Sequence, residues 1–194
     1  MNICVYGASS DLIDNSFIEA GEQLGEIIAQ RNHTLIFGGG DNGMMGAAAR
    51  GAFRKGGYII AITPEFLNVD GVLFQKCNEK YMTDGMRDRK KMLDEKSDAF
   101  VISAGGVGTF DEFFEMLTLK QLGRHKKPLV ILNTNNYFDE IIKMLNKCVD
   151  CNFMSEKSLE LFKVVNTPLE AVEYIENYKG ELADIKKMKY INNK

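Results

Sequence analysis

The sequence predicts one α/β domain in which a doubly wound parallel sheet lies between two layers of helices. Short apolar runs alternate with amphipathic helical patterns along the chain. Most of these runs are continuously apolar, as expected of parallel strands that helices cover on both faces. Turns rich in glycine or serine follow several of them. This alternation favours right-handed βαβ units in a three-layer αβα domain over residues 1–180.

Seven strands follow from the apolar runs, in chain order. They are Ile3–Tyr6, Thr34–Phe37, Tyr58–Thr63, Lys80–Met82, Ala99–Ser103, Pro128–Leu132 and Phe162–Val165. Three helical stripes are clear between them, because apolar side chains recur there at spacings of three and four residues. These stripes begin at Phe17, Phe110 and Phe138. The lysine-rich stretch 181–194 is expected to form a C-terminal helical tail.

Composition narrows the class of protein. Apolar residues make up 45% and charged residues 26% of the chain, and the formal net charge is −3, so nothing favours a nucleic-acid or membrane partner. The start of the chain lacks a signal-peptide pattern, and we expect a cytoplasmic protein. Cys148 and Cys151 form a CxxC pair inside a helical pattern without further ligands at zinc spacing. We interpret them as incidental thiols.

Three loops should meet at the carboxyl edge of the sheet, where ligands bind in such folds. They are residues 7–10, 38–46 and 104–109. The third loop reads AGGVGT and leads into a helix, an arrangement that brings backbone amides and a helix N-terminus to a phosphate. Asp111 and Glu112 follow in what the pattern indicates is the first helical turn. The loop therefore predicts a phosphate next to a working carboxylate.

Two of these motifs also have other interpretations. Thr109 and Glu112 match a T-x-x-E capping box, in which the glutamate only satisfies the start of the helix. Residues 38–43 match GxGxxG, but an acidic residue does not end the following strand as a nicotinamide cofactor would require. A mononucleotide phosphate or tight helix–sheet packing explains those glycines as well.

A basic run, Met86-Arg87-Asp88-Arg89-Lys90, opens a helix after the fourth strand. Positive charges at a helix N-terminus interact unfavourably with the helix dipole. A role as solvent-exposed side chains alone therefore explains this basic run less well. Arg87 and Arg89 are two positions apart and point to different helix faces, so at most one should reach the site.

Three motifs stand in the chain in the order FGGGDNGMMG (Phe37–Gly46), MRDRK (Met86–Lys90) and AGGVGTFDE (Ala104–Glu112). They resemble the YGGGxxGLMG, MxxRK and PGGxGTxxE elements of the LONELY GUY (LOG) family, the cytokinin-activating phosphoribohydrolases. Their order and spacing agree, and the resemblance extends from Ile3 to about Val165. The chain departs from the pattern at Ala104, where the family has proline, and at Arg87, which is often histidine.

The resemblance implies a homodimeric, Rossmann-like protein that hydrolyses a nucleoside 5′-monophosphate to free base and ribose 5-phosphate. The substrate would be AMP or an N6-substituted AMP such as a cytokinin riboside monophosphate. Arg89 and Glu112 occupy the positions of the family's catalytic pair. The residues implied to bind the substrate are Ser9, Ser10, Gly39, Met86, Lys90, Gly105, Gly106, Gly108 and Thr109. No metal or organic cofactor is expected.

Two other functions stay open at this point. A non-catalytic nucleotide-binding or carrier protein of the same fold would use the same glycine loops and treat Glu112 only as a cap. Amino-acid decarboxylation, a label sometimes attached to this family, needs a pyridoxal Schiff-base lysine in a larger framework, and the sequence offers no such motif.

Overall fold

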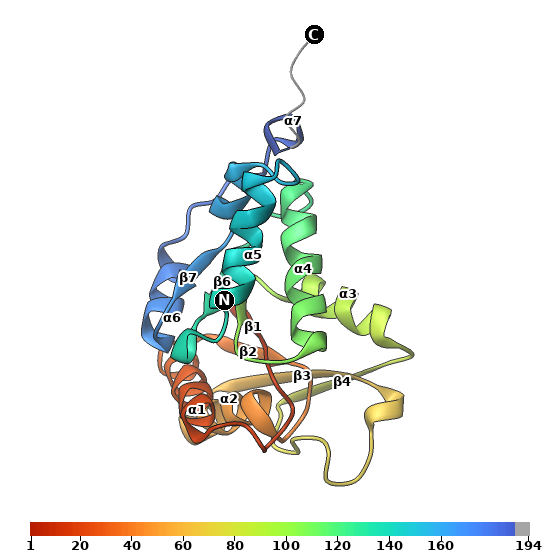
Figure 1. The fold of residues 1–194 in the computed structure, drawn as a ribbon. Coiled ribbons are helices and arrows are strands. Elements are labelled where there is room, and N and C mark those ends of the chain that lie inside the picture. Colours follow the sequence, from red (N-terminus) through yellow and green to blue (C-terminus); the bar gives the residue numbers. More distant parts are fainter. Residues whose placement is uncertain (189–194) are drawn as a thin grey trace.

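Seven parallel strands form the sheet at the centre of the molecule (Figure 1). The computed structural model describes residues 1–188. The strands are β1 (Asn2–Tyr6), β2 (Thr34–Phe37), β3 (Tyr58–Pro64), β4 (Glu79–Thr83), β5 (Ala99–Ile102), β6 (Leu129–Leu132) and β7 (Lys163–Val165). The sequence prediction is confirmed for each of them to within one residue at either end.

Helices cover both faces of the sheet (Figure 1). One layer consists of α1 (Asn15–Gln30), α2 (Gly43–Arg54) and α6 (Pro168–Asn177), and the other of α3 (Met86–Lys96), α4 (Val107–Gln121) and α5 (Asp139–Asp150). Short helices are η1 (Glu65–Leu67), η2 (Thr134–Asn136), η3 (Glu156–Leu161) and α7 (Ile185–Met188). Of the predicted C-terminal tail, residues 189–194 lie outside the described residues.

Side chains of each strand alternate between the two layers, because successive residues point to opposite faces of a sheet. Ile3 and Val5 pack in the core under α1, α2 and α6, whereas Cys4 and Tyr6 pack under α3, α4 and α5. Both faces are buried, which explains why the strand runs are continuously apolar. Phe114 departs from the predicted buried stripe of α4, since it is 40% exposed.

The order of the strands is β4-β3-β2-β1-β5-β6-β7, so the chain changes direction across the sheet between β1 and β5. Ile3 lies beside Leu35 of β2 on one side and beside Ala99 of β5 on the other. The loops that follow β1 and β5 meet directly, where the Ala8 amide donates to the Ala104 carbonyl over 2.9 Å. Ligands bind at this kind of topological switch point.

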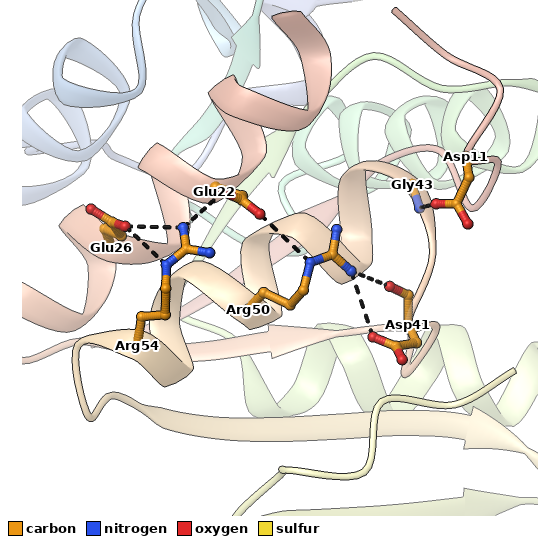
Figure 2. A network of polar contacts seen from close by, with 7 residues as sticks. All are labelled: Asp11, Glu22, Glu26, Asp41, Gly43, Arg50 and Arg54. Atoms are coloured by element: carbon orange, nitrogen blue, oxygen red, sulfur yellow. Dashed lines mark hydrogen bonds and ion pairs between the residues drawn. The ribbon is translucent and has the colours of Figure 1, made fainter. Parts of the chain in front are cut away.

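A network of ion pairs fixes α2 against α1 beside this edge (Figure 2). Arg54 Nη2 contacts Glu22 at 2.8 Å and Glu26 at 3.0 Å. Arg50 Nη1 donates to the backbone carbonyl of Asp41, within the glycine-rich loop between β2 and α2. The network therefore holds that loop as well as the two helices.

Two further findings concern membrane-spanning helices and metal ligands. No helix in residues 1–188 is both long and apolar enough to cross a membrane. Cys148 and Cys151 are free thiols at the end of α5. Within the same residues, no group of three or more His, Cys, Asp or Glu side chains is placed to hold a metal ion.

Candidate functional site

A cavity of about 340 Å³ opens at the carboxyl edge of the sheet, beside the switch point. Its volume lies in the range of roughly 300–1,000 Å³ that is usual for small-molecule sites. The loops after β1, β2, β3 and β5 contribute to it, together with α3 and α4. Its lining residues are Gly7, Ala8, Ser9, Gly38, Gly40, Met45, Thr63, Leu67, Val72, Leu73, Met86, Arg89, Gly106, Gly108, Thr109 and Glu112.

Arg89 and Glu112 form a buried ion pair in the wall of this cavity. Arg89 Nη1 donates to Glu112 Oε1 over 2.7 Å, and the two residues are only 6% and 7% exposed. A second bond, from Arg89 Nε to the carbonyl of Ile62 at 3.3 Å, ties the guanidinium to the end of β3. A guanidinium held at two nitrogens keeps a fixed orientation, and its other N–H groups remain to bind a ligand.

Gly38, directly after β2, makes room for this arginine. A Cβ atom at Gly38 would lie 2.2 Å from Arg89 Nη2, well inside contact distance. Any side chain there would displace the guanidinium. The glycine-rich loop is thus required here for the placement of Arg89, whatever its role toward a phosphate.

The protonation of Glu112 depends on two opposing effects. Burial raises the pKa of the Glu112 carboxyl above its usual range, because a charge is poorly solvated there. The charge of Arg89 and its hydrogen bond act in the opposite direction and lower the same pKa. The carboxylate is therefore kept both dry and close to a cation, as expected of a group that acts electrostatically.

The N-terminus of α4 is open to an anion. The helix begins at Val107, with Gly106 as N-cap and no side chain bonded to the cap. Among residues 1–188 we find no acceptor for the backbone amides of residues 106–109. Free amides at a helix N-terminus are a ready anion site, since they add to the positive end of the helix dipole.

This boundary rules out one alternative interpretation of the sequence and corrects one expectation. Thr109 is the third residue of α4 and not its N-cap, so the T-x-x-E capping box is not formed, and Glu112 bonds Arg89 instead. Asp111 and Glu112 lie in the second turn, because Val107 and Gly108, which the pattern left in the loop, already belong to the helix. The first turn carries no acid that would repel a phosphate.

The N-terminus of α2, by contrast, is already occupied by an acid (Figure 2). The carboxylate of Asp11, from the loop after β1, accepts a hydrogen bond from the Gly43 amide at 2.7 Å. The glycine-rich loop after β2 therefore presents its helix start to a protein carboxylate. Of these two helix starts, the one on α4 is left for a ligand anion.

The structure places the residues implied to bind substrate in two groups. Five of them line the cavity, namely Ser9, Met86, Gly106, Gly108 and Thr109. Ser10, Gly39, Lys90 and Gly105 lie outside its lining.

Three residues of the second group have contacts that explain their positions. Lys90 Nζ makes ion pairs with Asp111 at 2.9 Å and Glu115 at 3.0 Å, which join α3 to α4. Gly39 faces β3, and Gly105 packs behind the loop against Thr109.

Arg87 is exposed, so of the two arginines on α3 only Arg89 reaches the site.

Sequence reasoning missed the apolar wall of the cavity. Leu67, Val72 and Leu73 come from the segment between β3 and β4, where the sequence showed no strand or helix of its own. The glycine-rich loop fixes this segment, because Gly40 and Leu73 form an isolated antiparallel bridge. The short apolar run Val72–Phe74 was the one available signal.

Comparisons with known proteins show the family of this chain. A family model described as "Possible lysine decarboxylase" matches residues 45–175, more than half of the chain. The sequence is 34% identical over 170 residues to the cytokinin riboside 5′-monophosphate phosphoribohydrolase of Mycobacterium tuberculosis, covering 88% of this chain and 90% of that enzyme. It is 32% identical over 176 residues to the phosphoribohydrolase LOG3 of Arabidopsis thaliana, covering 91% of this chain and 82% of LOG3.

Solved structures show the same fold. The molybdenum cofactor binding protein of Rippkaea orientalis matches with a TM-score of 0.70 at 21% identity, over 90% of this chain and 94% of that one. The molybdenum cofactor carrier protein of Chlamydomonas reinhardtii matches with a TM-score of 0.69 at 22% identity, over 90% and 95%. With the family model spanning more than half of its length and relatives above 30% identity, this chain belongs to the LONELY GUY (LOG) family.

Proposed function

We propose that this protein hydrolyses the N-glycosidic bond of a nucleoside 5′-monophosphate, AMP or an N6-substituted AMP, to free base and ribose 5-phosphate. The observation that carries the proposal is the buried Arg89–Glu112 pair in a cavity that also contains an open helix N-terminus. Stability alone explains such a pair poorly, since replacing a buried ion pair by apolar residues is often neutral or stabilising. The names of the two curated relatives support the same reaction.

The 5′-phosphate would bind at the start of α4. Backbone amides of residues 106–109 are available there as donors, next to the Thr109 side chain. Binding energy from this end of the substrate would orient the ribose toward Glu112, so the phosphate contributes to the rate although it does not react.

Cleavage of the bond between C1′ and the base nitrogen builds positive charge on the ribose. The Glu112 carboxylate stabilises that charge and accepts a proton from the attacking water. The hydroxyl of the water joins C1′, the bonding electrons leave with the base, and a proton ends on the base nitrogen. Arg89 keeps Glu112 ionised and in place.

Nucleotide binding without cleavage is the second candidate function. One observation favours it. Glu112 already accepts a hydrogen bond from Arg89, as the carboxylate of a purely structural residue would. Under this function AMP raises the melting temperature of the protein, but no base is released.

Amino-acid decarboxylation, which the description of the family model names, is less well supported. Of the described side chains that line the cavity, none is a lysine. A pyridoxal-dependent reaction would need a lysine amine there to hold its cofactor as a Schiff base.

Chromatography of products from a panel of nucleoside monophosphates tests the proposal. Equal amounts of free base and ribose 5-phosphate should appear with AMP, with N6-substituted AMP, or with both. AMP binding without either product would overturn hydrolysis and favour the second candidate. We also expect a homodimer, which light scattering after gel filtration would establish.

A further inference from the structure

Tyr137, at the end of η2, reaches the phosphate loop from outside the cavity. Its hydroxyl donates to the backbone carbonyl of Gly105 over 2.7 Å. Gly105 is the first glycine of the loop that starts α4, and neither residue lines the cavity. Tyr137 therefore contacts the back of the loop that would hold the ligand.

The planar peptide between Gly105 and Gly106 connects this bond to the cavity. In a trans peptide the carbonyl and the following N–H point in opposite directions. With the Gly105 carbonyl held by Tyr137, the Gly106 N–H points away from the tyrosine, and Gly106 itself lines the cavity. Glycines are free to rotate such a peptide, so a fixed acceptor on one side selects the orientation of the donor on the other.

Tyr137 is 43% exposed, and contacts of the turn and of its ring hold it in place. Asn133 Oδ1 accepts from the Phe138 amide at 2.7 Å, and Asn133 Nδ2 donates to Asp139 at 2.9 Å, which closes the turn around η2. The ring of Tyr137 also packs edge-on against Phe17 of α1, with centroids 5.8 Å apart. These contacts restrict the positions from which the Tyr137 hydroxyl can donate to the loop.

We propose that Tyr137 is a positioning residue for the substrate phosphate, which acts by aiming the Gly106 amide into the cavity. This inference rests on the proposed function, because it takes the start of α4 as the phosphate site. Affinity for the phosphate end of the ligand thus depends on a residue that lies outside the three family motifs.

Tyr137→Phe tests this, since the ring remains and only the hydroxyl is lost. Calorimetric titration should show AMP and ribose 5-phosphate binding roughly three- to tenfold more weakly, while adenosine, which lacks the phosphate, binds as before. The KM for AMP should rise by a similar factor, and kcat should change less. Tyr58→Phe is the matched control, because it removes a tyrosine hydroxyl bonded to Glu79 at the opposite end of the sheet.

The possible failures are distinguishable. If wild-type protein binds AMP and Tyr137→Phe binds AMP and ribose 5-phosphate equally well, the positioning role is wrong and the proposed function stands. An equal loss for AMP and adenosine, with a lowered melting temperature, would show a general structural role and overturn the inference. If wild-type protein binds no phosphate-bearing ligand, the proposed function fails and the inference fails with it.

Discussion

Arg89 on α3 and Glu112 on α4 join the two helices through one charged hydrogen bond of 2.7 Å, closed off from water on almost every side. Burial of both charges carries a large desolvation penalty, which their attraction repays only when the geometry is good. The carbonyl of Ile62 and the space at Gly38 supply that geometry. Helix packing, the glycine loop and the end of β3 thus converge on a single guanidinium.

Replacing Arg89 should destabilise the fold. Arg89→Met leaves Glu112 buried without its cation, and we expect a loss of about 3 kcal/mol in the free energy of unfolding at neutral pH. Removing the cation raises the pKa of Glu112 further, so the loss should grow as the pH rises and shrink as Glu112 becomes protonated. Urea titrations at two pH values measure this. Arg89→Met/Glu112→Gln should recover part of the stability, and no recovery would contradict the pairing.

Gly38→Ala should lower activity more than stability. The added methyl group meets Arg89 Nη2, and a displacement of about an ångström can lower kcat/KM by up to roughly a hundredfold. Gly85→Ala is the control, because it adds the same group before α3 where nothing lies within 4 Å. Equal effects of both variants on kcat/KM would show that Gly38 has no special relation to Arg89.

The pH profile should follow the carboxylate. Glu112 must be ionised to act, so kcat/KM should rise with pH through its pKa. Because burial raises that pKa above 4.5, the acidic limb should lie above the value of an exposed glutamate. A limb at or below 4.5 would argue that another group controls the rate.

Lys120 provides a prediction on stability away from the site. This lysine of α4 is 2% exposed, and burial lowers its pKa from 10.5 to about 8. Between these two values the unfolded chain holds the proton and the folded chain does not, so the contribution of Lys120 to stability should increase as the pH rises from 8 to 10.5. Denaturant titrations should show wild type gaining stability relative to Lys120→Met over this range, because the variant lacks the contribution. Lys91→Met, on an exposed pair, should keep it.

The strands and the position of the site could be predicted from the sequence, because both depend on local pattern. A strand that is buried on both faces needs a continuous apolar run, as in Ala99–Ile102. Few segments outside the strands show such a run. Glycine turns after β1 and β5 then indicated the switch point. The pattern itself indicated a carboxylate beside the loop and one of two arginines, and the family motifs singled out Arg89 and Glu112.

Other features depend on contacts between distant segments and left little trace in the sequence. The amide of Gly43 is taken by Asp11, 32 positions away, and no local rule predicts that partner. The pattern predicts the start of α4 two residues late, because it leaves Gly108 in the loop, whereas this glycine lies in the first turn at a position where an added Cβ would meet nothing within 4 Å. The bond from Tyr137 to Gly105 spans 32 positions in the same way.

The most direct test of the account compares wild type with Glu112→Gln on the same nucleotide. AMP binding is measured by calorimetry, and release of ribose 5-phosphate is measured separately under single turnover. We expect Glu112→Gln to bind AMP nearly as wild type does and to release product roughly 10²–10⁴-fold more slowly. Glu140→Gln, on an exposed pair of α5, should behave as wild type. Equal rates for wild type and Glu112→Gln would contradict the central claim that this carboxylate drives the cleavage.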